Sequence, residues 1–167
     1  GYGMPGISER VYPDDMDCGR PVQAALQRVF RERYLLARQW LAQHFAREAA
    51  GPARASTGGE MRIVDIACGS GFGSAILSEL GQVLGVDVDP DTVGYAVSHY
   101  GGNGRVSFRL GDANDRGFLG SLPRAHAIVS LATIEHLSDP SAFLEWVGQA
   151  LLPGGACVLG FPANFTR

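Results

Sequence analysis

Residues 63–73 read Ile-Val-Asp-Ile-Ala-Cys-Gly-Ser-Gly-Phe-Gly, and this run constrains the fold more than any other part of the chain. The apolar residues around Asp65 predict a short buried strand, and the three glycines that follow predict a tight turn. A helix-forming apolar run comes next, over residues 75–80. A strand, a glycine turn and a helix bring backbone N–H groups against a ligand, so the run predicts a site for a nucleotide-like molecule.

Length and composition bound the class of protein. The 167 residues suit one domain with a single core, and 46% hydrophobic with 19% charged residues is typical of a globular chain. A net charge of −3 gives no electrostatic reason to expect nucleic acid as a partner. No apolar run approaches the roughly 20 residues that span a bilayer, and no signal peptide is visible. Cys18, Cys68 and Cys157 are odd in number and far apart, which favours reduced thiols. We therefore expect a cytoplasmic protein with no membrane partner.

The first 60 residues form a segment distinct from the rest. Residues 1–20 lack periodicity and indicate an irregular arm, whereas apolar residues recur at helical spacing from Pro21 to Gly51. Two aromatic residues in this helix, Tyr34 and Trp40, are expected to be core residues. Residues 51–60 are rich in Gly, Ala and Ser and indicate a flexible link.

From residue 61 the pattern alternates between strands and helices. Short buried strands alternating with helices predict an α/β fold with a doubly wound, mostly parallel sheet, whose ligand binds beyond the carboxyl ends of the strands. We expect strands near 61–67, 82–87, 105–110, 126–131 and 156–161, and helices near 73–80, 90–100, 114–120 and 141–151.

An acid ends the second predicted strand. Asp87 lies 18 residues after Gly69, the spacing at which a carboxylate reaches the two hydroxyls of a ribose. Its alternative role is to cap the helix at 90–100, but Asp89, directly before Pro90, is better placed for that. An acid at this position also disfavours a cofactor with a 2′-phosphate.

A second acid ends the third predicted strand, in Gly111-Asp112-Ala113. A carboxylate followed by a backbone N–H can bind the edge of an adenine ring. A lone Gly-Asp pair is usually only a turn, but this pair follows Asp87 in the order that such a site requires. The glycines alone do not select a cofactor. A dinucleotide-binding motif in this register would have its third glycine, or an alanine, at position 74, where this chain has serine.

Five motifs together resemble one family. Val-Asp-Ile-Ala-Cys-Gly-Ser-Gly-Phe-Gly is followed by Val-Asp-Val-Asp, Gly-Asp-Ala, Ile-Glu-His-Leu and Leu-Leu-Pro-Gly-Gly. In this order and spacing, over about residues 61–162, they are similar to those of the class I S-adenosylmethionine-dependent methyltransferases, which have a Rossmann-like fold. Thr-Ile-Glu-His-Leu, with the arm and long helix before the sheet, resembles bacterial members that methylate small molecules and glycans.

The resemblance implies S-adenosylmethionine as cofactor and S-adenosylhomocysteine as product. It implies that Asp65 orients the cofactor's amino group or braces the glycine turn. The remaining implied contacts are the methionine moiety over Ala67, Gly69 and Gly71, the ribose on Asp87, the adenine among Val88, Asp112 and Ala113, and the sulfonium near Leu131. No metal site is expected, because Ala132 stands where metal-binding relatives have a glutamate.

The resemblance also implies transfer of a methyl group to oxygen or nitrogen of a small molecule or glycan. His136 is the candidate catalytic base, and a packing or capping role for it stays open. Residues 1–60 are expected to form a lid or cap over the core at 61–167. The family sheet has seven strands, whereas this chain ends at Arg167 just after the fifth, so we expect a truncated core whose exposed edge an oligomeric partner could cover.

Two other readings remain. A chain with an incomplete sheet can be a non-catalytic cofactor-binding scaffold, or one part of a heteromeric or truncated methyltransferase. An NAD-dependent oxidoreductase is disfavoured by the position of Gly73 and by the Gly-Asp-Ala and Leu-Pro-Gly-Gly motifs.

Overall fold

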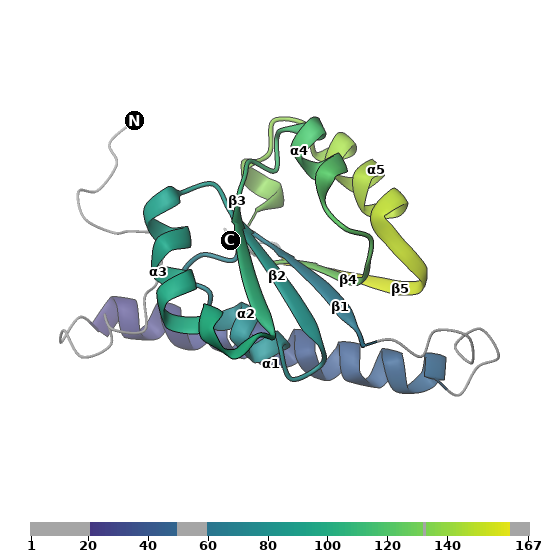
Figure 1. The fold of residues 1–167 in the computed structure, drawn as a ribbon. Helices are drawn as coiled ribbons and strands as arrows, with labels where there is room; N and C mark the ends of the chain where they lie inside the picture. Colours follow the sequence, from purple (N-terminus) through teal and green to yellow (C-terminus); the bar gives the residue numbers. More distant parts are fainter. Residues whose placement is uncertain (1–20, 50–59, 132, 161–167) are drawn as a thin grey trace, which may run out of the picture.

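The computed structural model describes residues 21–49, 60–131 and 133–160, with side chains from residue 27 onward. Its centre is a five-stranded parallel sheet in the order β3-β2-β1-β4-β5, which confirms the predicted doubly wound arrangement (Figure 1). The order reverses between β1 and β4, the place where such sheets bind ligands. The strands are β1 (Arg62–Ile66), β2 (Gln82–Asp87), β3 (Val106–Leu110), β4 (Ala125–Ser130) and β5 (Leu151–Leu159).

Helices cover both faces of the sheet. Helices α1 and α2 pack on one face and α4 and α5 on the other (Figure 1). Aspartates accept backbone N–H bonds at the start of three helices: Asp89 caps α3, Asp115 caps α4 and Asp139 caps α5. None of the described helices is long and apolar enough to cross a membrane. The helices are α1 (Pro21–Ala49), α2 (Phe72–Leu77), α3 (Pro90–Tyr100), α4 (Arg116–Ser121) and α5 (Pro140–Ala150), with single 3₁₀ turns η3 (Gly101–Asn103) and η4 (Ile134–His136).

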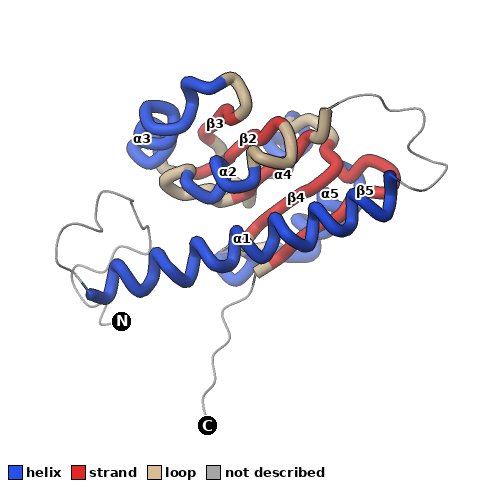
Figure 2. Tube along the Cα trace, turned by 90° about the horizontal axis from the view of Figure 1, so that it is seen from below, coloured by secondary structure: helices blue, strands red, loops and turns tan. Residues whose placement is uncertain are grey.

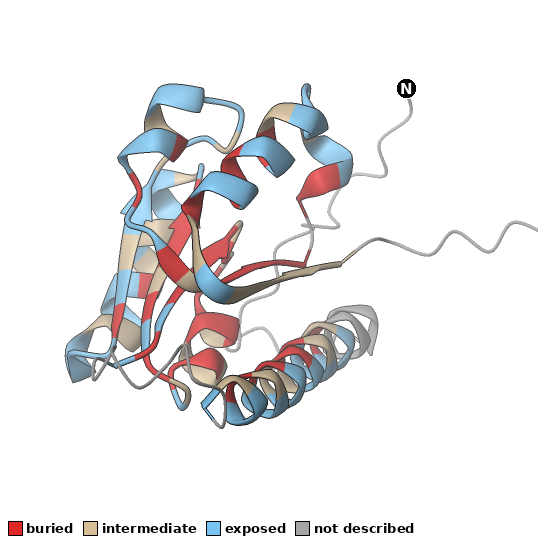
Figure 3. Ribbon diagram, turned by 90° about the vertical axis from the view of Figure 1, so that its right-hand side faces the viewer, coloured by how far each residue is buried: buried red, intermediate tan, exposed pale blue. Residues whose placement is uncertain are grey.

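Helix α1 belongs to the core of the domain. Figure 2 shows it running across one face of the sheet, past α2 toward β5. Its inward residues Tyr34, Leu41 and Phe45 join a buried cluster with side chains of β1, β2, β3 and β4, while its outward side is exposed (Figure 3). Trp40 lies on the outward side and is 53% exposed, so the expectation of a core tryptophan is wrong. The sheet covers only one side of a helix, and helical spacing alone does not fix which side that is.

Polar contacts also join α1 to the rest of the domain. Arg38 pairs with Glu79 just after α2, with 2.9 Å between nitrogen and oxygen. Near the end of the helix, His44 Nε2 donates to the Gly154 carbonyl at 2.8 Å. The arm at residues 1–20 and most of the link at 51–60 lie outside the described residues, and a lid role for the N-terminal segment stays a prediction.

The fifth strand begins earlier than predicted. Ala125 pairs with Leu151, but Ala127 pairs with Ala156, so β5 carries an irregularity between these two pairings. Gly154 has φ +77°, in the left-handed region, and Pro153 has no N–H to give to a strand ladder. The Leu-Pro-Gly-Gly motif is therefore a bulge inside a strand, which the sequence pattern presents as a loop before it.

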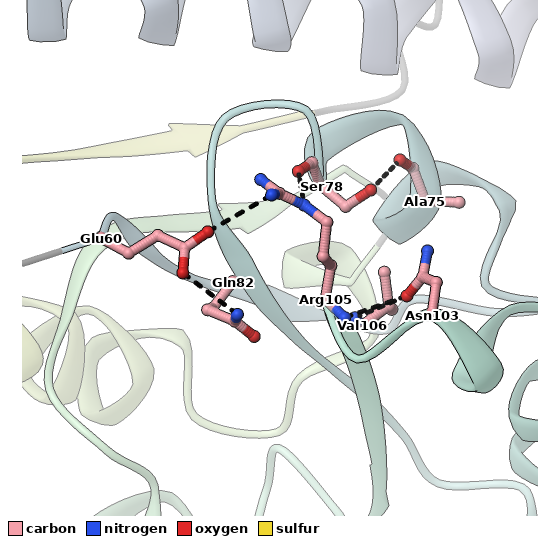
Figure 4. A network of polar contacts seen from close by, with 7 residues as sticks. All are labelled: Glu60, Ala75, Ser78, Gln82, Asn103, Arg105 and Val106. Atoms are coloured by element: carbon pink, nitrogen blue, oxygen red, sulfur yellow. Dashed lines mark hydrogen bonds and ion pairs between the residues drawn. The ribbon is translucent and has the colours of Figure 1, made fainter.

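A polar network ties the amino ends of three strands together, at the edge opposite their carboxyl ends. Arg105 donates to the Ser78 carbonyl at 2.9 Å and pairs with Glu60 at 3.4 Å, and Glu60 also accepts from Gln82 at 3.2 Å (Figure 4). The charged groups of this pair are about half exposed. Such a pair contributes at most about 1 kcal/mol, so the network aligns strand ends more than it stabilises the fold.

The burial of α1 gives a test of its place in the core. Leu41 is 1% exposed and Leu36 on the same helix is 43% exposed. Leu41→Ala is expected to lower the free energy of unfolding by about 2–5 kcal/mol, because it leaves a cavity. Leu36→Ala, the control, is expected to change it by about 0.5 kcal/mol or less. Urea denaturation measures both, and equal effects would mean that α1 does not pack on the sheet as described.

Candidate functional site

The predicted site residues gather at the carboxyl ends of neighbouring strands. The glycine turn follows β1, Asp87 ends β2 with Val88 directly after it, and Asp112 follows β3. Strands β1, β2 and β3 are adjacent and parallel, so these three loops share one edge of the sheet. The backbone joins two of them directly, because the Gly111 N–H donates to the Asp87 carbonyl at 3.0 Å.

The glycine turn runs through the left-handed backbone region. Ala67, Gly69 and Gly71 have φ of +60°, +57° and +93°. A Cβ on Gly71 would lie 2.8 Å from the Phe108 ring and 2.9 Å from the Ala96 Cβ, whereas a Cβ on Gly69 would have no atom within 4 Å. Packing in the interior therefore requires a glycine at position 71. Gly69 has open space where a side chain would stand, so its need for glycine comes from its backbone conformation.

Asp87 fixes the turn to the end of β2. Its side chain is buried, and its Oδ2 accepts the Gly69 N–H at 3.0 Å. Its Oδ1 accepts the Asp89 N–H at 3.1 Å. The cap of α3 is Asp89, as predicted, because its carboxylate accepts from the first residues of that helix. These contacts fix the orientation of the carboxylate at the end of β2.

Val88 and Asp112 present an apolar and a polar surface at neighbouring positions. Val88 is 56% exposed, which is unusual for a large apolar side chain directly after a buried strand. Asp112 is exposed, its Oδ1 accepts the Asn114 N–H at 2.9 Å, and Ala113 beside it is half-buried. This pairing matches what a flat, polar-edged ring requires: an apolar contact for its face and a carboxylate for its edge.

Asp65 lies beneath the turn. It is 0% exposed, and its two oxygens accept from Tyr34 Oη at 3.1 Å and from Ser74 Oγ at 2.7 Å. Burial, and to a smaller extent the nearby charge of Asp87, raise the pKa of Asp65 to about 7 against the lowering effect of the two hydroxyls. These contacts suit a group that braces the turn from below.

The segment after β4 holds the other two predicted residues. Leu131 is 5% exposed and packs in the cluster that α1 covers. His136 ends the turn η4 and is exposed, and its Nε2 lies 3.7 Å from Glu135 Oε1. Residue 132 lies outside the described residues. The described part of the chain contains no group of three or more His, Cys, Asp or Glu side chains that could hold a metal ion.

The structure adds residues that the sequence pattern misses. Tyr34 and Ser74 hold Asp65, and Phe108 packs against Gly71. The sequence around Tyr34 indicates only a helix, and nothing in it indicates that the tyrosine hydroxyl reaches β1. Contacts between elements distant in sequence leave no local pattern, so these roles become visible only in the fold.

The fold and these loops together define an α/β domain whose predicted site residues lie at the carboxyl edge of its sheet. A family model described as "Methyltransferase domain" matches residues 64–159. The chain belongs to this family of methyltransferase domains.

Curated relatives agree with this assignment. The chain is 33% identical over 124 residues to a ubiquinone biosynthesis O-methyltransferase of Azorhizobium caulinodans, an alignment that covers 73% of this chain and 47% of that protein. It is 32% identical over 100 residues to the protein of the same name from Cereibacter sphaeroides, covering 59% and 40%. The chain thus spans about half the length of the curated relatives it matches.

Solved structures share the fold. A TehB-like SAM-dependent methyltransferase from Corynebacterium glutamicum is 26% identical, with a TM-score of 0.53 over 77% of this chain and 74% of that one. An arsenic (III) S-adenosylmethionine methyltransferase from Chlamydomonas reinhardtii is 24% identical, with a TM-score of 0.55 over 60% and 38%. The family and these structures confirm S-adenosylmethionine as the cofactor expected from the motifs.

Gly69 and Gly71 are expected to differ in how much an added side chain destabilises the fold. Gly69→Ala is expected to lower the free energy of unfolding by about 1–2 kcal/mol through backbone strain alone. Gly71→Ala adds the clash with Phe108 and Ala96, about 1–3 kcal/mol more. Urea denaturation of both variants measures the difference. Equal losses of unfolding free energy in the two variants would show that the interior accommodates a Cβ at position 71.

Proposed function

We propose that this chain is the cofactor-binding part of an S-adenosylmethionine-dependent methyltransferase that transfers a methyl group to an oxygen of a small molecule. The observation that carries the proposal is the arrangement of three neighbouring loops: an open Gly69, a carboxylate at Asp87 and an exposed Val88 beside Asp112. Each suits a different part of the cofactor.

The residues present fit the cofactor in kind and order. The space beside Gly69 where a side chain would stand is open, which suits the approach of the methionine moiety. Asp87 is held in place by two N–H groups and suits the ribose hydroxyls. Val88 and Asp112 suit the face and the amino edge of adenine. When bound, the cofactor supplies a methyl group activated by a positive sulfur.

The chain's own part in catalysis is mainly alignment. Holding an acceptor in line with the activated methyl group supplies about 7–11 kcal/mol through orientation. Leu131 lies at the end of β4, next to the reversal of strand order. We assign it to packing near the sulfonium, and we assign His136, exposed five residues later, to removal of the acceptor's proton.

An oxygen acceptor is supported by the names of the curated relatives, which are O-methyltransferases. A hydroxyl acceptor needs a base, and an imidazole in this segment supplies one. The sequence pattern also leaves room for a nitrogen or glycan acceptor, and these are the alternatives that an acceptor panel distinguishes.

The second candidate is a non-catalytic cofactor-binding scaffold, or one part of a larger or heteromeric enzyme. The shared length supports it, because the chain spans only 47% of its first curated relative. Fold alone does not decide the matter: the [4+2]-cyclase SpnF shares the fold with a TM-score of 0.57 at 20% identity. Turnover with any acceptor excludes the non-catalytic reading.

Asp87 is the sharpest test of cofactor binding. Asp87→Asn is expected to weaken the binding of S-adenosylmethionine and S-adenosylhomocysteine by at least about tenfold, because it removes a charged acceptor for two hydroxyls. Asp91→Asn, which changes the same charge on an exposed residue of α3, is the control and leaves affinity unchanged. Isothermal calorimetry measures both, with NAD alongside. Tight binding of NAD instead would contradict the proposed function.

His136 tests the catalytic assignment. With a panel of phenols, alcohols and amines as acceptors, His136→Ala is expected to lower kcat by about 10²–10⁴-fold while the cofactor's Kd stays unchanged. His99→Ala, an exposed histidine on α3, is the control. Unchanged kcat in His136→Ala would assign the residue to packing.

A further inference from the structure

Tyr34 reaches from α1 to the underside of the glycine turn. It is 4% exposed, and its hydroxyl donates to Asp65 Oδ1 at 3.1 Å. Its ring meets Phe72 edge to face, with 5.9 Å between ring centroids, and fills the space that a Cβ on Gly73 would need. A single side chain of α1 thus contacts two consecutive residues at the start of α2 and, through Asp65, a third.

Asp65 connects this tyrosine to the turn. Its Oδ1 accepts from Tyr34, and its Oδ2 accepts from Ser74 in the first turn of α2 at 2.7 Å. Within the described residues no Lys, Arg or His pairs with this buried carboxylate. Two neutral hydroxyls therefore carry the whole task of holding it.

We propose that Tyr34 is a positioning residue of the cofactor site, which acts through Asp65: its hydroxyl orients the Asp65 carboxylate beneath the turn and favours its ionised form. The inference rests on the proposed function, because it concerns the same cofactor. Helix α1 then supports the site from below through a specific hydrogen bond as well as through packing.

The chemistry of the cofactor gives this bond a consequence. S-adenosylmethionine carries an ammonium and a sulfonium, so an ionised Asp65 beneath the turn attracts it and a protonated one does not. The pKa of Asp65 is about 7, raised by burial first and by Asp87, and lowered by the hydroxyls of Ser74 and Tyr34. The titratable groups that face it are Tyr34 on α1, Cys68 in the turn and Asp87 on β2.

The direction of the pH effect follows. Affinity for the cofactor is full above the pKa of Asp65 and falls as the pH drops through about 7. Tyr34→Phe removes a hydrogen bond that favours the ionised form, so the pKa of Asp65 rises and the fall in affinity begins at a higher pH. An upward movement of about one pH unit corresponds to a loss of about fivefold in affinity at pH 7 and almost none at about pH 8.5.

The experiment is a calorimetric titration of the 167-residue chain with S-adenosylmethionine, at steps from about pH 6 to about pH 8.5. Tyr34→Phe and Ser74→Ala are the test variants, since each removes one hydroxyl from Asp65. Leu41→Ala is the control, because it damages the packing of α1 without touching Asp65. We expect the pH midpoint of affinity to rise in both test variants and to stay in place in Leu41→Ala.

Two results would overturn the inference. One is a wild-type affinity that does not change with pH across this range. The other is a loss in Tyr34→Phe that is the same at every pH, which is what a packing defect produces. If the wild-type chain binds no S-adenosylmethionine even at about pH 8.5, the proposed function fails, and the control of Asp65 by Tyr34 is then decided by a measurement without cofactor.

A second measurement, without cofactor, shows which of the two ideas has failed. The pKa of Asp65 in the folded chain is about 7, above its ordinary value of 3.8, so the folded state binds this proton more tightly than the unfolded state. Its contribution to stability is therefore full below about pH 4 and is lost as the pH rises through about 7. In urea denaturation, Tyr34→Phe is expected to extend this loss to higher pH. An unmoved profile would show that Tyr34 does not control Asp65.

Discussion

The turn after β1 depends on two buried carboxylates. Asp87 accepts the Gly69 N–H from the side at 3.0 Å, and Asp65 accepts the Ser74 hydroxyl from below at 2.7 Å. Ala67, Gly69 and Gly71 all have positive φ, a backbone state that persists only where its surroundings over-determine it. These acceptors fix the turn together with its backbone hydrogen bonds, and α2 begins directly after Gly71.

The same carboxylates carry an electrostatic preference. The charge of Asp87 raises the pKa of Asp65. Two acids beneath and beside one turn favour a cationic group over an anionic one there. The spacing of glycines alone does not reveal such acids.

The sequence predicts the local features well because they are encoded locally. Asp89 before Pro90 indicates the start of α3, the alternation of apolar strands indicates the sheet, and the acids at strand ends indicate the edge of the site. Its errors concern partners that lie far away along the chain. Trp40 has the helical spacing of a core residue but faces outward, and β5 begins at Leu151 because a proline-glycine bulge pairs as part of the strand. The bond between Tyr34 and Asp65 spans 31 residues and has no local signature.

The difference between locally encoded and long-range features also bears on function. The residues predicted to hold the cofactor follow β1, β2 and β3, and the local signals for them are strong because each lies at the carboxyl end of a strand. The region proposed for the acceptor lies after β4, where the chain offers His136, and the curated relatives extend to about twice the aligned length. A shared cofactor imposes the same strand ends on every member of such a family, while acceptors differ. The motifs therefore describe the cofactor half of the proposed site, which the shared cofactor constrains. The acceptor is determined by segments whose sequence can vary.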